Sequence, residues 1–209
     1  MLYERQDPWA HVALEQLARQ SQQPLGRLHA LFALDGMHAL TPETLLPRLD
    51  GAKPEIRRHV VRLAERVLDS SPTVRSRLAS RTDDSELIVR YQLAVTLSEM
   101  PEPERSHGLA ALALRDRGNA WIELAIRSSA VESAGTLLAL LADDLEYARS
   151  DVGLAMMGSL AVQIGKQQRP AHIAAVGRCF PRWPTGRLPC CGHSSANSVS
   201  NGAPSCRNG

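Results

Sequence analysis

Apolar residues recur at helical spacing along most of this 209-residue chain. Two segments carry the pattern most clearly, one at Ile56, Val60, Leu63, Ala64 and Val67, the other at Val89, Leu93, Thr96, Leu97 and Met100. Steps of three and four residues place such side chains on one stripe of a helix, and an apolar stripe has to be buried. The pattern therefore predicts amphipathic helices, packed against one another.

The pattern also repeats, with a period near 30 residues. Pro, Arg and His recur at an offset of 30 between residues 24–30 and 54–60. A further shift of 33 superimposes residues 89–93 on 56–60, and one more reaches residues 122–126, where the apolar positions remain and the arginine is lost. Self-similarity at a fixed period of this length is typical of stacked repeat proteins.

Each repeat is interpreted as two helices. The arginine-containing helix is preceded by a shorter apolar-periodic segment, and these segments span residues 10–18, 42–49, 74–79 and 104–114. A further pair is expected at residues 133–142 and 150–164. A single pair cannot bury its stripe alone, so the pairs must stack, and we predict an all-α protein, an α-solenoid of about five helical pairs in a right-handed superhelix.

The residues at the expected helix ends and the composition of the chain agree with this prediction. Prolines stand where first helical turns are expected, at Pro8, Pro42, Pro54 and Pro72, and a first turn tolerates the missing N–H. Thr41 with Thr44, Asp50, Ser71 and Asp84 are candidate caps or turn residues, and Gly36, Gly51 and Gly118 fall between expected helices. Apolar residues form 44% of the chain and aromatic ones only 4%, which suits Ala- and Leu-rich helices better than a β-sandwich.

The string Pro-x-x-Arg-x-x-Ala/Val-x-x-x-Leu/Ala resembles the signature of HEAT repeats. Residues 2–7 (LYERQD) and 28–36 (LHALFALDG) are similar to the HEAT-repeat segment of planctomycete-type membrane-bound dehydrogenases. In that family the segment lies between a β-propeller and a c-type cytochrome domain. The resemblance implies a HEAT-repeat domain at residues 1–177, a fragment of a longer bacterial array. No propeller is present, so no quinone or sugar site is carried over.

The C-terminal tail differs from the rest of the chain. From Arg178 onward there are four arginines and no acid, so subtracting four from the 24 basic residues leaves 20 against 22 acids in residues 1–177, a net charge of −2. The tail, residues 178–209, is rich in Cys, Pro, Ser and Gly and is predicted to be disordered. A nucleic-acid partner is therefore not expected for the folded part.

All four cysteines also lie in the tail, at Cys179, Cys190, Cys191 and Cys206, and with His193 they suggest a zinc site. No Cys-x-x-Cys pair exists, however, and Cys190-Cys191-Gly192-His193 has the wrong spacing for the Cys-x-x-Cys-His haem motif. We therefore predict no metal and no cofactor.

One set of basic residues is a candidate interaction surface. Arg27, Arg57 and Arg90 occupy equivalent repeat positions, with His29 and His59 each two residues after an arginine. Such a ladder is suited to an acidic peptide or a phosphate backbone. The favoured alternative is structural, with the arginines bridging adjacent repeats through acids such as Asp50 or Asp84.

Two tryptophans also have both a functional and a structural interpretation. Trp9 and Trp121 are either exposed anchors for a partner or packed between repeats, and packing is the favoured alternative.

No catalytic constellation is recognisable. Glu65, Glu132 and the Asp143-Asp144 pair lack a partnered base or nucleophile, and there is no Gly-rich phosphate loop. We therefore predict a non-catalytic scaffold for a protein partner or another domain of a parent polypeptide. The alternatives are a truncated structural segment of a membrane-bound dehydrogenase/cytochrome c electron-transfer protein and, less favoured, a DNA-binding HEAT protein of the alkylation-repair kind.

The ends of the chain suggest two further expectations. No run of apolar residues is long enough to span a membrane, and the N-terminus lacks a signal peptide. We expect a soluble chain, cytoplasmic by default, although the family it resembles is exported. The repeats have no polar capping helix, so self-association through their ends is expected.

Overall fold

The computed structural model describes residues 8–51 and 53–179. Within that part every regular element is helical and no strand occurs, so the predicted all-α class is confirmed. The longer elements are α2 (Pro8–Gln20), α3 (Pro24–Gly36), α5 (Pro54–Ala64), α6 (Pro72–Ala79), α7 (Leu87–Thr96), α8 (Glu104–Arg115), α9 (Ala120–Ser129), α10 (Ala134–Asp143), α12 (Asp151–Gln167) and α13 (Pro170–Cys179). The shorter ones are α4 (Pro42–Leu45), α11 (Leu145–Arg149) and the 3₁₀ turns η1 (Leu46–Arg48), η2 (Glu65–Val67), η3 (Ser80–Asp83) and η4 (Leu97–Glu99).

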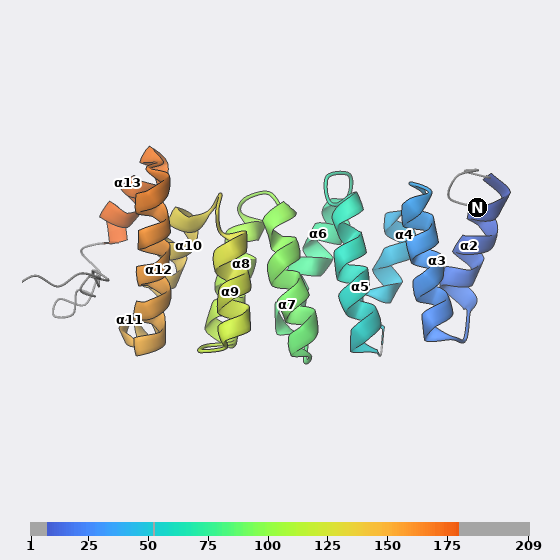
Figure 1. Ribbon diagram of the computed structural model, residues 1–209, viewed down its shortest axis with the longest axis horizontal. Helices are drawn as coiled ribbons and strands as arrows, with labels where there is room; N and C mark the ends of the chain where they lie inside the picture. The colour runs from blue at the N-terminus through green and yellow to red at the C-terminus, as the bar shows by residue number, and fades with distance from the viewer. Residues whose placement is uncertain (1–7, 52, 180–209) are drawn as a thin grey trace, which may run out of the picture.

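The helices follow one another in chain order along the long axis of the molecule (Figure 1). Five of them, which we call the second helices, are α3, α5, α7, α9 and α12, and each packs directly on the next. Within the pairs, α2 packs on α3, α4 on α5 and α8 on α9. The helices of the other layer also pack on one another, with α6 on α8, α8 on α10 and α10 on α13.

Local sequence explains where the helices begin. Proline occupies the first turn of α3, α4, α5 and α6, where no intrahelical N–H bond is lost. The predicted cap at Thr41 is a reciprocal capping box with Thr44, and Ser71 accepts a hydrogen bond from the Val74 amide. Gly118 has a positive φ of 78°, which glycine adopts without steric cost.

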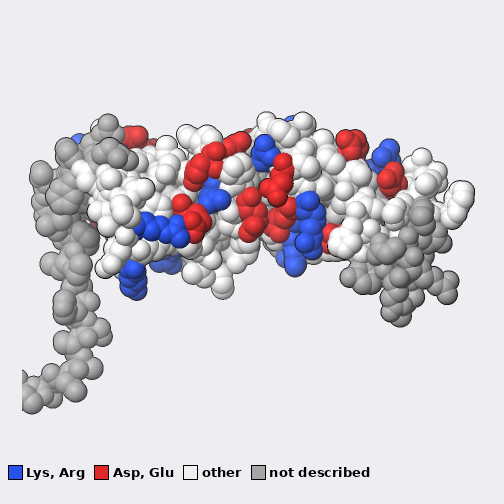
Figure 2. All heavy atoms as spheres, turned by 90° about the horizontal axis from the view of Figure 1, so that it is seen from above, with Lys and Arg blue, Asp and Glu red and all other residues white. Residues whose placement is uncertain are grey.

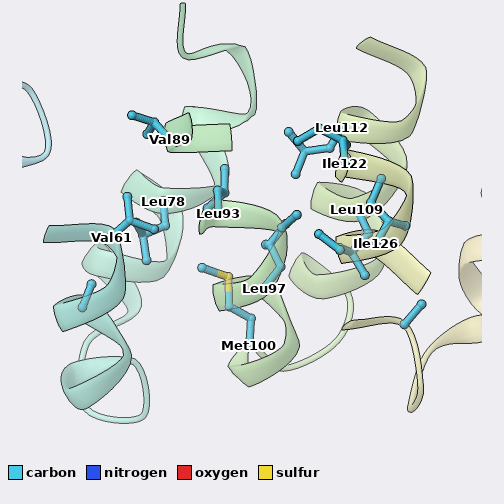
Figure 3. Packing of buried hydrophobic residues seen from close by; sticks show 14 of the residues in the cluster. Val61, Leu78, Val89, Leu93, Leu97, Met100, Leu109, Leu112, Ile122 and Ile126 are labelled. Atoms are coloured by element: carbon cyan, nitrogen blue, oxygen red, sulfur yellow. The ribbon is translucent and has the colours of Figure 1, made fainter. Parts of the chain in front are cut away.

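The buried stripes meet in one continuous core between the two layers. Leu93 of α7 and Leu97 of η4 lie between Val61 and Leu78 on one side and the residues of α8 and α9 on the other, where Ile122 lies beside Leu112 and Ile126 beside Leu109 (Figure 3). Residues predicted from periodicity, among them Val60 and Val89, are fully buried. Because each stripe is covered by neighbouring helices on both sides, no helical pair has a core of its own.

The sequence predicted most helices to within a few residues and missed two. The segment expected at residues 150–164 is α12, and α11 lies just before it. Beyond the expected last pair, α13 packs on α10. The predicted domain limit at residue 177 falls inside α13, and the tail predicted to be disordered lies, from residue 180 on, outside the described residues.

Candidate interaction surface

The three arginines of the predicted ladder make one contact in common. Each donates a hydrogen bond to the backbone carbonyl six residues earlier, Arg27 to Ser21, Arg57 to Gly51 and Arg90 to Asp84. The acceptors lie in the turns that precede the second helices. The repeated arginine therefore ties the beginning of its own helix to the preceding turn.

Two of these arginines also bridge consecutive repeats. The Arg57 guanidinium donates to both carboxylate oxygens of Asp84, at 2.9 and 2.8 Å, and Arg90 does the same to Asp116, at 2.8 and 2.6 Å. The side chains of Arg57 and Asp84 are only 10% and 2% exposed. Bidentate pairing of this kind is the strongest form of arginine–carboxylate contact.

The pKa shifts of the paired residues agree with the geometry of the pairs. The hydrogen bond that Arg57 donates to Asp84 raises the pKa of Arg57, and the one that Arg90 donates to Asp116 raises the pKa of Arg90. Burial raises the pKa of Asp84, but hydrogen bonds from Arg57 and the Glu86 amide outweigh burial and hold that pKa below its usual value. Arg57 and Asp84 are therefore both held in their charged forms at neutral pH.

Arg57 and Arg90 are thus engaged inside the molecule, as the structural alternative predicted for Asp84. Asp50 has a different partner, because it pairs with Arg77 and Arg81 of the following α6 and η3. The bridge is not repeated a third time, since Glu123 stands at the position equivalent to Arg90. Arg27 is half-buried and held by its carbonyl contact.

The two histidines of the predicted surface lie nearer the solvent. His29 of α3 is exposed and His59 of α5 is half-buried. The His59 ring meets Phe32 of α3 edge to face, with centroids 5.5 Å apart. Arg58 lies 3.2 Å from Nε2 of His59 and has only donors, so that nitrogen accepts and carries no proton.

Burial, and then the charges of Arg58 and Arg62, lower the pKa of His59. The imidazole is therefore neutral at physiological pH, and it lies within the positive field of those two side chains. Whether His29 and His59 bind a partner stays a prediction.

Sequence periodicity missed a second, exposed stripe on the same helices. On α7 it consists of Ile88, Tyr91 and Val95, and on α9 of Trp121 and Leu124. Trp121 follows Ile88 by 33 residues, as Leu124 follows Tyr91, so these side chains occupy equivalent positions on helices that pack directly together. We call these five residues the apolar band.

The residues of the band are well exposed. Trp121 is 67% exposed, Leu124 51% and Ile88 42%. Single exposed apolar residues are common, whereas contiguous ones mark interaction sites. The signal was present in the sequence, because these positions recur at the 33-residue period outside the buried stripe.

The expectation that both tryptophans pack between repeats was wrong. Trp9 is 86% exposed on α2, and Trp121 lies on the outward side of α9. The inward positions of α9 are taken by Ile122 and Ile126, which the helical period places on the opposite face.

The acidic residues considered as catalytic candidates have structural contacts. Glu65 accepts a hydrogen bond from the Thr96 hydroxyl at 2.7 Å, Glu132 pairs with Arg169, and Asp144 caps α11 through the Tyr147 amide. The described part contains no cluster of His, Cys, Asp or Glu that could hold a metal ion. The tail cysteines Cys190, Cys191 and Cys206 and His193 lie outside the described residues.

Surface charge has no single sign on the face seen from above (Figure 2). Acidic side chains gather over the middle of that face, with basic ones on either side. Mixed charge of this kind gives no extended positive track for a phosphate backbone. Among the described helices none has the length and apolar character needed to cross a membrane.

Comparisons with protein-family models, curated proteins and solved structures give no match to this chain.

Proposed function

We propose that this chain is a non-catalytic interaction protein, built as an α-solenoid of the HEAT type with about five helical pairs in a right-handed superhelix. Support for the architecture comes from the direct contacts between successive second helices. Further support comes from the arginine at a fixed repeat position, which joins one repeat to the next through Asp84 and Asp116. Repeats held together in this way present an extended surface rather than an enclosed pocket.

The apolar band is the observation that carries the function. Its five residues lie exposed on adjacent second helices, and four of them form two pairs at equivalent repeat positions. A side chain that only maintained the fold would be placed in the core, where Val89 and Ile122 already fill that role. Burying such a band against a partner gains hydrophobic free energy that the isolated chain forgoes.

A peptide-display selection on the immobilised chain tests the proposal. Peptides that bind the wild type should bind the Ile88→Asp variant at least about tenfold more weakly, because a carboxylate in the band would be desolvated without a partner. Leu145→Asp is the matched control, since Leu145 is 51% exposed on α11, outside the band. Selected peptides that bind both variants equally well would refute a binding role for the band.

A further inference from the structure

We propose that the apolar band and the arginines of the neighbouring helix α5 form one docking surface for a protein segment with apolar residues in one half and acidic residues in the other. This inference rests on the proposed function and specifies the chemistry of the partner.

The repeat places the two parts of this surface side by side. Arg58 precedes Tyr91 by 33 residues and Arg62 precedes Val95 by the same number, so the arginines occupy on α5 the positions that the band occupies on α7. Helices α5 and α7 pack directly on each other. Packed helices have axes about 8–10 Å apart, and one bound segment can therefore contact both.

Arg58 and Arg62 differ from the other arginines of the second helices. Arg57 and Arg90 are buried against carboxylates, whereas Arg62 is exposed and Arg58 contacts the His59 ring. No ion pair between either side chain and a carboxylate is found in the described part of the chain. Glu55 lies one turn earlier on the same stripe and offsets part of the charge.

The composition of the combined surface is that of a protein-binding site. Trp, Tyr and Arg are the residues that most often dominate interface affinity, and Trp121, Tyr91, Arg58 and Arg62 supply them here. Two arginines are few for an anionic membrane, which is bound through clusters of four to eight basic residues. The apolar residues of α7 and α9 are complementary to an apolar half of a bound segment, and the positive charge of α5 is complementary to an acidic half.

Three synthetic peptides of about 20 residues provide the test. A helix of that length spans about 30 Å and an extended chain more, which is enough to cross α5, α7 and α9. The peptides share one half, rich in Leu and Trp, and carry Glu, Gln or Lys in the other half. Binding of each labelled peptide is measured by fluorescence anisotropy at low and physiological salt.

We expect the Glu peptide to bind about tenfold more tightly than the Lys peptide, with the preference shrinking as salt rises. In the Arg62→Glu variant the order should reverse. Arg149→Glu, which changes an exposed arginine of α11, is the matched control and should keep the wild-type order. Equal binding of the three peptides, or the same preference in the Arg62→Glu variant, would overturn the inference.

The outcomes separate this inference from the proposed function. Binding that Ile88→Asp abolishes but that has no charge preference contradicts the acidic partner and leaves the band as a binding surface. Two further results also overturn the inference. One is tight, band-dependent binding to phosphatidylserine-containing vesicles with no peptide bound, and the other is a dimer in sedimentation that Ile88→Asp converts to monomer.

Discussion

At the residue scale, Asp84 connects two second helices, and Arg90 continues the chain of contacts toward a third. Its carboxylate holds Arg57 of α5, its carbonyl accepts from Arg90 of α7, and Arg90 in turn holds Asp116 ahead of α9. Because Asp84 is buried, any loss of its charge leaves a buried guanidinium without its counter-ion, which costs more than the pair contributes.

Replacing Asp84 by Asn should therefore destabilise the fold by about 3 kcal/mol, measured as a lower urea midpoint. Asp50→Asn removes a carboxylate that pairs with Arg77 but is 44% exposed, and should cost about 1 kcal/mol or less. Equal losses of stability in the two variants would show that burial does not make the Arg57–Asp84 pair more important to the fold than the exposed pair of Asp50.

The lowered pKa of His59 predicts that the stability of the fold depends on pH. Its folded-state pKa is lowered by burial and by Arg58 and Arg62, so the unfolded chain binds a proton more readily. The stability gained from the neutral ring is complete above the ordinary pKa near 6.5 and is lost as the pH falls below that value.

Thermal melts between pH 5 and 8 check this dependence. The slope of stability against pH should become flatter in the His59→Gln variant, while His29→Gln, which changes the exposed imidazole of α3, should follow the wild type. An unchanged slope in His59→Gln would assign the dependence to other groups.

At the element scale, periodicity was enough to predict the second helices and most of their partners. It failed at α11, whose five residues from Leu145 to Arg149 are too short to establish a 3.6-residue period. It failed also at α13, which reaches α10 through a close approach at Gly135, where an added Cβ would lie 2.8 Å from the His172 Cα. Such contacts depend on the path of the backbone, which a hydrophobic pattern does not contain.

The same reasoning limits the prediction of the surface. The Arg27, Arg57 and Arg90 ladder was recognised as a repeat, yet only the structure distinguishes the buried Arg57 from its exposed neighbour Arg62. The apolar band has the same helical spacing as the buried stripe, so periodicity alone does not show which of the two faces the solvent.

Two glycines of α12 provide a matched test of packing. A Cβ on Gly153 would collide with the backbone carbonyl of Tyr147, whereas one on Gly165 would meet nothing within 4 Å. Gly165→Ala should stabilise the protein by up to about 1 kcal/mol through helix propensity. Gly153→Ala should destabilise it, and calorimetric melting temperatures that shift in the same direction for both variants would contradict the packing described around α11 and α12.

At the scale of the whole molecule, the second helices lie side by side along the long axis (Figure 1). The exposed stripe on them changes in character along the row, from Leu25 and Phe32 on α3, through the arginines of α5, to the apolar band on α7 and α9. A surface patterned in this way offers a bound segment apolar contacts, which supply affinity, and charged contacts, which set its orientation.

The central claim is that the chain acts by binding a partner through the apolar band, and two exposed tryptophans in the described part of the chain, Trp9 and Trp121, allow a direct test. The measurement is the dissociation constant of a peptide selected on the wild type, for Trp121→Ala and for Trp9→Ala. Trp121 is in the band and Trp9, which is even more exposed, is not. We predict that Trp121→Ala weakens binding by about 30-fold or more, as for an interface anchor, and that Trp9→Ala changes it less than about twofold. Equal effects of the two substitutions, or none from Trp121→Ala, would contradict the account.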